Sequence, residues 1–294
     1  MHKKFIGTGV AIVTPFHKYG TIDFNSLGKV IEHVITQGVD YIVALGTTGE
    51  SVTLTTDEKV AVIDYVIENV DKRVPVVIGM GGNKTQEVVN FIKSVSFDGI
   101  DAILSVSPYY NKPQQRGLYR HYENIAAACP VPVILYNVPG RTSSNISVET
   151  VLKLSKNIDN IIGIKEASGD LTQCMEIIKN KPEDFLVISG DDLLTLPMIA
   201  IGGNGVISVV ANAFPKEFSE MVTAAIRGDF KSAREIHYKL TEIINALFAD
   251  GNPAGIKAAL DILGHCSNNL RLPLVKVNKS VYNQLKTLIQ DFNS

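Results

Sequence analysis

Residues 161–170, with the sequence IIGIKEASGD, place one lysine where it could do chemistry. Mostly β-branched residues lead into Lys165 and turn formers follow it, which predicts a short buried strand ending near the lysine. Side chains alternate along a strand, so residues two apart should share a face. The face of Lys165 should then carry Ile161, Gly163 and Ala167, and the opposite face Ile162 and Ile164.

A lysine on the inner face of such a strand is a candidate nucleophile. Desolvation disfavours its charged form, and a neutral amine can attack a ketone to form a Schiff base. A structural role is the alternative, in which the ammonium reaches Glu166, another carboxylate or water at the strand end. These ten residues leave both interpretations open, and the remaining sequence has to decide between them.

Further polar residues stand where other predicted strands end. Thr47 and Thr48 lie in the polar turn GTTGE at 46–50, whose backbone N–H groups and hydroxyls could hold a carboxylate. Tyr109 and Tyr110 follow another strand. A plain glycine turn with Thr48 exposed is the structural alternative for the first of these segments.

Tyr136 and Arg141 follow the fifth predicted strand. Tyr136 has the parity of Ile134, so we expect it to face inward, where a phenol could carry a proton to or from a carbinolamine. Arg141 could clamp a carboxylate with two parallel hydrogen bonds. The structural alternatives are a core tyrosine with a satisfied hydroxyl and a surface ion pair.

The positions of these polar residues follow from a predicted alternation of strands and helices along the chain. Apolar runs predict strands at 9–15, 41–45, 75–79, 102–106, 131–136, the lysine segment, 185–189 and 205–210. Helical patterns separate them, with Asp23 and Ser147 as N-caps and a capping box formed by Thr55 and Glu58. Buried strands that alternate with helices pair in parallel.

The repeat of about 25–30 residues predicts a closed (β/α)₈ TIM barrel with a C-terminal helical extension. An open doubly wound sheet is disfavoured, because no strand is followed by a G-x-G-x-x-G turn. Beyond residue 215 only helical patterns continue, at 218–226, 230–248, 253–263 and 281–292. We therefore expect a catalytic barrel over residues 1–224 and a helical region over 225–294, packed beside the barrel or in a subunit contact.

The composition bounds the class of protein. The 294 residues carry a net charge of −2 with 45% apolar and 20% charged residues, which is typical of a soluble enzyme and disfavours nucleic-acid or membrane partners. Cys129, Cys174 and Cys266 show no disulfide or zinc spacing, which indicates a reducing compartment. Without a signal peptide or an apolar run of membrane length, we expect a cytoplasmic protein that acts on small molecules.

Three other classes of barrel were weighed. A metal-dependent aldolase or hydrolase needs clustered ligands, whereas the histidines are scattered along the chain, at His2, His17, His33, His121, His237 and His265. The GGNG sequence at 202–205 precedes the eighth strand, on the face opposite to phosphate loops, so it predicts a turn. A non-catalytic barrel would be favoured if Lys165, Tyr136 or Thr47 were missing, and all three are present.

Five motifs together resemble the dihydrodipicolinate synthase family of class I pyruvate aldolases. They are GTTGE at 46–50, SPYYNKP at 107–113, YNVPGRT at 136–142, GIKEA at 163–167 and SGDD at 189–192. They follow the family's order and span nearly the whole chain. N-acetylneuraminate lyases and 2-keto-3-deoxy sugar acid aldolases are the related alternatives, and Arg141 favours the synthases. Gly140 departs from the serine that is frequent in the synthases.

The resemblance implies a reaction and roles for individual residues. Lys165 would form a Schiff base with pyruvate, which then condenses with L-aspartate-β-semialdehyde to give 4-hydroxy-tetrahydrodipicolinate, the first committed step of diaminopimelate and lysine biosynthesis, with no cofactor or metal. The implied site residues are Thr47, Tyr136 and Tyr110 as a proton relay, Thr48 for the pyruvate carboxylate, Arg141 for the semialdehyde carboxylate, and Gly190 and Ile207 lining the site. In the family the tyrosine matching Tyr110 comes from a neighbouring subunit, which implies a dimer and usually a homotetramer of paired dimers.

The resemblance also implies an allosteric cleft for L-lysine between subunits. The matching positions are Ser51, Val52, Thr56, Lys59, Asn83, Glu87 and Tyr109. Lysine-sensitive relatives often carry histidine at the positions of Thr56 and Lys59. Since a second ammonium at Lys59 would repel the effector, we expect weak or absent inhibition by L-lysine.

Overall fold

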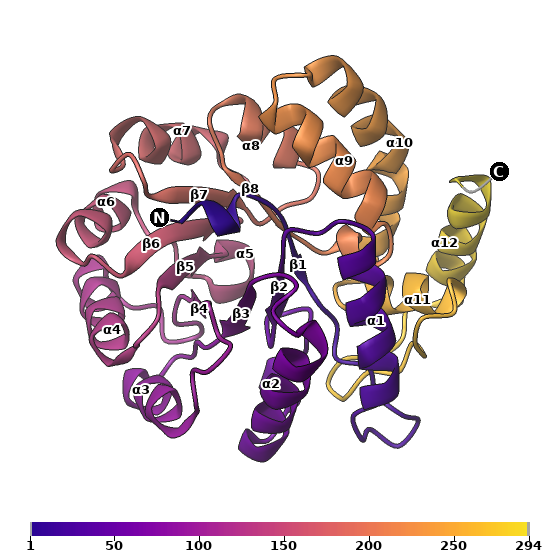
Figure 1. The fold of residues 1–294 in the computed structure, drawn as a ribbon, viewed down its shortest axis with the longest axis horizontal. Helices are drawn as coiled ribbons and strands as arrows, with labels where there is room; N and C mark the ends of the chain where they lie inside the picture. The colour runs from indigo at the N-terminus through magenta and orange to yellow at the C-terminus, as the bar shows by residue number, and fades with distance from the viewer. Residues whose placement is uncertain (1, 293–294) are drawn as a thin grey trace.

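Residues 2–292 are described by a computed structural model, in which eight strands close into a barrel (Figure 1). The strands are β1 (Gly7–Ala11), β2 (Tyr41–Ala44), β3 (Val76–Gly79), β4 (Ala102–Val106), β5 (Val133–Asn137), β6 (Ile161–Glu166), β7 (Leu186–Ser189) and β8 (Gly205–Ser208). Each strand pairs in parallel with the next, and β8 pairs with β1. The predicted (β/α)₈ barrel is confirmed.

Helices surround the barrel and continue beyond it. They are α1 (Phe24–Thr36), α2 (Thr56–Val70), α3 (Thr85–Ser94), α4 (Gln115–Ala128), α5 (Pro139–Thr142), α6 (Val148–Asn157), α7 (Leu171–Asn180), α8 (Thr195–Ala200), α9 (Pro215–Ile226), α10 (Phe230–Phe248), α11 (Ala254–Ile262) and α12 (Lys279–Phe292), with 3₁₀ turns η1 (Lys3–Phe5), η2 (Ser51–Thr53) and η3 (Val210–Asn212). Asp23 and Ser147 cap α1 and α6, and Thr55 and Glu58 form the capping box of α2. These caps are the predicted ones.

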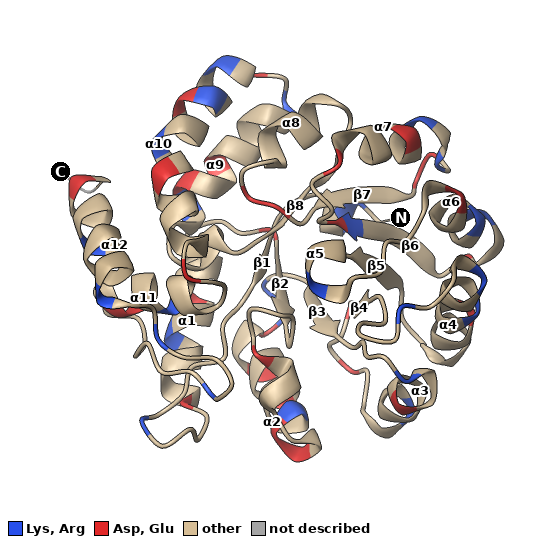
Figure 2. Ribbon diagram, turned by 180° about the vertical axis from the view of Figure 1, so that it is seen from behind, with Lys and Arg blue, Asp and Glu red and all other residues tan. Residues whose placement is uncertain are grey.

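The strands bury both faces, because one faces the barrel interior and the other faces the helices. Ile134, Ile188 and Ile207 belong to the inner cluster, whereas Val10 and Ile42 pack with helix residues in the outer one. Charged residues lie mainly on the surrounding helices and loops, and the strands are largely free of them (Figure 2). A charged side chain inside this barrel is therefore an exception that needs an explanation.

One part of the predicted alternation in β6 is wrong. Ile161 pairs with Val133 but Gly163 pairs with Ile134, so the register shifts at Ile162. This bulge turns Ile162 into the inner cluster and leaves Ile161 in the outer one. Beyond the bulge the expected alternation holds, and Lys165 lies on the inner face.

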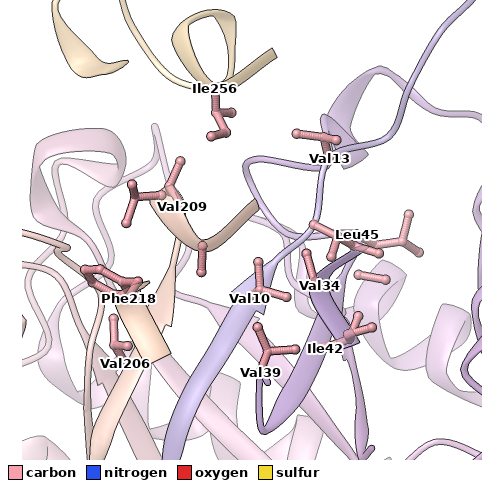
Figure 3. Close-up of a cluster of buried hydrophobic side chains, with 14 of the residues drawn as sticks. Val10, Val13, Val34, Val39, Ile42, Leu45, Val206, Val209, Phe218 and Ile256 are labelled. Atoms are coloured by element: carbon pink, nitrogen blue, oxygen red, sulfur yellow. The ribbon is translucent and has the colours of Figure 1, made fainter. Parts of the chain in front are cut away.

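The C-terminal helices lie on the side of the barrel formed by β8 and β1, where α9 packs against both strands and α11 packs against η3. Ile256 of α11 points toward Val209 and Val13, which follow β8 and β1 (Figure 3). α12 packs in turn on α10 and α11. None of the helices in residues 2–292 is long and apolar enough to cross a membrane.

Candidate active site

Lys165 lies near the carboxyl end of β6, inside the barrel. It pairs across the sheet with Tyr136 on β5, and its side chain is only 5% exposed. The Lys165 Nζ lies 4.5 Å from the centroid of the Tyr136 ring. No ion pair involves Lys165 within residues 2–292. The amine is thus placed against a phenol ring at the barrel mouth without a carboxylate partner.

Glu166 is not the partner of Lys165. Its buried carboxylate accepts hydrogen bonds from the Asn137 amide, from the backbone N–H of Ser168 at 2.8 Å and from Gln173 Nε2 at 3.0 Å. Successive residues of a strand point to opposite faces, which separates this carboxylate from the amine. The interpretation of Lys165 as the ion-pair partner of Glu166 is therefore wrong.

Gly190 and Ile207 lie on the strands or strand ends beside the lysine. Gly190 follows β7, and its N–H donates to the Glu166 carbonyl at 2.8 Å. A Cβ on Gly190 would lie 2.9 Å from the Lys165 Cε and 2.6 Å from the Cβ of Ala167. Ile207 on β8 is 1% exposed and belongs to the inner cluster. A glycine at position 190 therefore leaves the space that the lysine side chain occupies.

The turn after β2 carries the two predicted threonines in a tightly fixed backbone. Leu45 and Glu50 adopt left-handed conformations, with φ of 57° and 52°. The Leu45 carbonyl lies against Gly79, where a Cβ would be only 2.2 Å away. The Glu50 N–H donates to the Thr47 carbonyl at 3.1 Å. Thr48 is buried and Thr47 half-buried within this turn.

Asn252, which the sequence analysis missed, touches both predicted carboxylate-binding residues. Its Nδ2 donates to Thr48 Oγ1 at 3.1 Å, and its backbone carbonyl accepts from Arg141 Nη2 at 3.4 Å. The Asn252 Oδ1 is buried without a hydrogen-bond partner within the described residues. Asn252 lies just before α11, so the C-terminal region contributes to the barrel mouth.

Arg141 is carried by the short helix α5, which begins with Pro139, ends at Thr142 and is followed by Ser143 in a left-handed conformation. Thr142 fastens this turn, because its hydroxyl donates to the Ser144 carbonyl at 2.9 Å. The Arg141 side chain itself is exposed. A solvent-facing guanidinium on a fixed turn suits an incoming carboxylate.

Tyr110 lies in the loop after β4 and points into solvent. Its side chain is 90% exposed, and its φ of 73° is unusual for a residue other than glycine. Asn83 fixes the neighbouring backbone, since its Nδ2 donates to the Tyr109 carbonyl at 3.3 Å and its carbonyl accepts from Asn111 Nδ2 at 3.0 Å. Within the described chain Tyr110 shares no hydrogen bond with Thr47 or Tyr136.

The positions predicted for an L-lysine cleft lie on neighbouring segments. They are Ser51 and Val52 in η2, Thr56 and Lys59 on α2, Asn83 before α3, Glu87 on α3, and Tyr109 after β4. Asn83 and Tyr109 are in contact, and Val52 is 78% exposed. The Lys59 ammonium lies 5.8 Å from the centroid of the Phe91 ring, and Glu87 pairs with Lys84 at 2.7 Å. Within the described residues, η2 and the loop after β4 share no hydrogen bond.

Two further buried acids stabilise the barrel mouth. Asp192 accepts from the N–H groups of Val209 and Val210, the latter at 2.9 Å, and burial raises the pKa of its carboxyl to about 6. Glu50 forms a fully buried ion pair with Lys257 of α11. The sequence signal for this pair was a lysine inside the otherwise apolar run of α11.

The histidines are less scattered than the sequence suggests. His33 of α1 and His265 after α11 stack with ring centroids 4.0 Å apart. Burial, reinforced by the neighbouring His265, lowers the pKa of His33 to about 4. In residues 2–292 no group of three His, Cys, Asp or Glu side chains is arranged to hold a metal ion.

The chain is similar to known proteins over nearly its whole length. A model of the dihydrodipicolinate synthetase family matches residues 4–292. Proteins named 4-hydroxy-tetrahydrodipicolinate synthase from Flavobacterium psychrophilum and Parabacteroides distasonis are 53% and 50% identical, over 96% of this chain and 96% of the first, and 98% of this chain and 97% of the second. The crystal structure of dihydrodipicolinate synthase from Aquifex aeolicus has a TM-score of 0.96 at 43% identity and covers 98% of both chains.

Proposed function

Because the chain belongs to the dihydrodipicolinate synthetase family, we propose that it condenses pyruvate with L-aspartate-β-semialdehyde to give 4-hydroxy-tetrahydrodipicolinate. The enzyme is a lyase of diaminopimelate and lysine biosynthesis. The observation that carries this function is the buried amine of Lys165, which has no carboxylate partner in the described chain and lies over the ring of Tyr136.

The proposed reaction begins at the Lys165 Nζ, which attacks the ketone carbon of pyruvate to form a carbinolamine. Loss of water gives an imine, and loss of a methyl proton gives an enamine. The enamine carbon adds to the aldehyde of the semialdehyde, and the amine of that substrate displaces Lys165 by transimination and closes the ring. The protonated imine takes up the electron pair of the methyl C–H bond, so these steps use no metal or organic cofactor.

Tyr136 is the proton-transfer residue nearest to the amine. Its ring already lies beside the Lys165 Nζ, on the neighbouring strand. In the proposed relay Thr47 connects its phenol to Tyr110, whose exposed side chain is supplied by a neighbouring subunit. General acid–base groups of this kind contribute roughly 10²–10⁴-fold to a rate.

The two substrate carboxylates are assigned to two sides of the mouth. Thr48 and the backbone around it bind the carboxylate of pyruvate, and Arg141 binds that of the semialdehyde. Asn252 supports this assignment, because it contacts the Thr48 hydroxyl with its amide and Arg141 with its carbonyl. Gly190 and Ile207 line the space around the Schiff base.

The exposed side chains of Tyr110, after β4, and of Val52, in η2, support assembly with other subunits through these two segments. We assign a dimer in which each Tyr110 serves the neighbouring site, and a homotetramer of two such dimers. Cys129, Cys174 and Cys266 are free and buried, which suits a cytoplasmic enzyme in a reducing compartment.

The second substrate decides between the synthase and other pyruvate aldolases. The purified enzyme should consume pyruvate with L-aspartate-β-semialdehyde and not with N-acetylmannosamine. Arg141→Met should raise the KM for the semialdehyde by roughly 10–100-fold while changing the KM for pyruvate little, because the guanidinium binds only the second carboxylate. Turnover with N-acetylmannosamine at a comparable kcat/KM would overturn the assignment.

A further inference from the structure

A buried ion pair connects α11 to the turn that holds the catalytic and substrate-binding threonines. The side chains of Glu50 and Lys257 are both 0% exposed, although the residues lie 207 positions apart. The Lys257 ammonium also donates to the Asn269 carbonyl at 2.9 Å and lies 4.2 Å from the centroid of the Phe16 ring. The ammonium is therefore surrounded by a carboxylate, a carbonyl and an aromatic ring.

Glu50 transmits this contact to the turn. Its N–H donates to the Thr47 carbonyl at 3.1 Å, and its own carbonyl accepts from the Thr53 N–H at 2.9 Å. The second carboxylate oxygen accepts from the Arg271 N–H at 3.1 Å. Because Glu50 is held in a left-handed conformation, movement of its side chain would change the backbone that carries Thr47.

The same C-terminal segment reaches the turn at a second point. Asn252 lies one residue before the N-cap of α11 and binds the hydroxyl of Thr48. Lys257, near the middle of α11, binds the residue that closes the turn. Ile256 between them is buried and points toward Val13 and Val209 (Figure 3). The turn is thus attached to the C-terminal segment at two points, one just before α11 and one within it.

Stability alone is a weak reason for this pair. Removing two charges from water costs free energy that their attraction often only balances, and well-packed apolar replacements are frequently as stable. A displacement of about 1 Å in a binding or catalytic group, in contrast, costs up to roughly 100-fold in rate. Precise placement of Thr47 and Thr48 is the stronger reason for a charged pair at this depth.

We propose that Lys257 is a positioning residue, which acts through Glu50 to hold Thr47 and Thr48 in the geometry that binds pyruvate. The proposal rests on the function proposed above. It assigns the C-terminal helical region a part in the reaction through a residue that is itself fully buried. Lys257 should therefore affect pyruvate binding more than stability.

Two variants separate positioning from folding. Lys257→Met leaves Glu50 buried without its cation, whereas the double variant Glu50→Met with Lys257→Met removes both charges and retains apolar volume. Ile125→Ala in α4 is the control, because Ile125 is 0% exposed, so its truncation lowers the Tm, and α4 packs against α3 and α6 on another side of the barrel. For each protein we would measure Tm, kcat, KM and the pyruvate concentration that half-saturates borohydride trapping of the Schiff base.

Both Lys257 variants should raise the half-saturating pyruvate concentration roughly tenfold or more, and the double variant should do so with a Tm near that of the unmodified enzyme. Ile125→Ala should lower the Tm and leave that concentration unchanged. Unchanged half-saturation in the double variant would overturn the positioning role. If the unmodified enzyme traps no pyruvate at all, the proposed function fails instead, so the two failures are distinguishable.

Discussion

Gly190 lies against the side chain of Lys165, so closely that a Cβ on the glycine would be 2.9 Å from the Lys165 Cε. Gly190, which follows β7, thus restricts the positions that the Lys165 side chain can adopt. The lysine stem can give way, but only by moving the Nζ away from the position beside Tyr136.

Gly190→Ala should therefore impair catalysis more than folding. We expect kcat/KM for pyruvate to fall by roughly 10–100-fold, because the added methyl displaces the amine from its attack geometry. Steady-state kinetics and the Tm measure the two effects. Gly140→Ala is the matched control, since no atom lies within 4 Å of a Cβ at that position, and it should retain normal kinetics. Equal kinetics of the two variants would contradict the packing argument.

Tyr136→Phe tests the phenol separately from the ring. The variant keeps the aromatic face 4.5 Å from the Lys165 Nζ but loses the hydroxyl that is proposed to move protons. We expect kcat to fall by roughly 10²–10⁴-fold with a small change in Tm. Tyr41→Phe removes a buried phenol that donates to the Val206 carbonyl, near the amino ends of β2 and β8, and should retain most of the kcat. A Tyr136→Phe enzyme with normal kcat would remove this residue from the relay.

Acidification should destabilise the fold through buried neutral histidines. Burial lowers the pKa of His121 to about 4 from its ordinary 6.5, and that of His33 similarly. The unfolded chain binds these protons first, so the free energy of unfolding should fall as the pH drops from about 6.5 to 4. Burial raises the pKa of Asp192, to about 6, and that of Asp40, and these carboxyls act in the opposite direction as they become protonated. Burial also lowers the pKa of His237 and of His265, which adds to the effect of the first two histidines.

His121→Gln should flatten this pH dependence, as measured by denaturant unfolding between pH 7 and pH 4. This range covers both titrations of His121, near pH 6.5 in the unfolded chain and near pH 4 in the folded protein. His17→Gln, at an exposed position, is the control and should keep the slope of the unmodified protein. A His121→Gln slope that matches the control would contradict the prediction, because it would show that this imidazole titrates alike in the folded and unfolded states.

L-lysine should inhibit the enzyme weakly or not at all. The Lys59 ammonium stands in the predicted cleft beside Phe91, where it would repel the ammonium of the effector. Initial rates with millimolar L-lysine should remain near those without it. Changing Thr56→His together with Lys59→His should increase the inhibition, and strong inhibition of the unmodified enzyme would contradict the prediction.

The sequence predicted the catalytic strand well because its signal is local. Lys165 follows β-branched residues and precedes a turn, and the caps at Asp23, Thr55 and Ser147 involve partners only a few residues away. The bulge at Ile162 was not predicted. A register shift depends on the pairing with the neighbouring strand, and the residue types of a six-residue strand do not show it.

Long-range contacts at the mouth could not be predicted in the same way. Asn252 meets Thr48 across 204 positions, and Lys257 meets Glu50 across 207. No spacing rule connects such residues, and α5 and α8 are too short for a helical period to be recognised. A lysine within the apolar run of α11 was the one local sign that this region holds a buried charge.

Borohydride reduction in the presence of pyruvate, followed by mass spectrometry of the digested protein, tests the central claim most directly. The account predicts one reduced pyruvate adduct, located on the peptide that contains Lys165 and absent from Lys165→Met. An adduct on another lysine such as Lys257, or no adduct at saturating pyruvate, would contradict it.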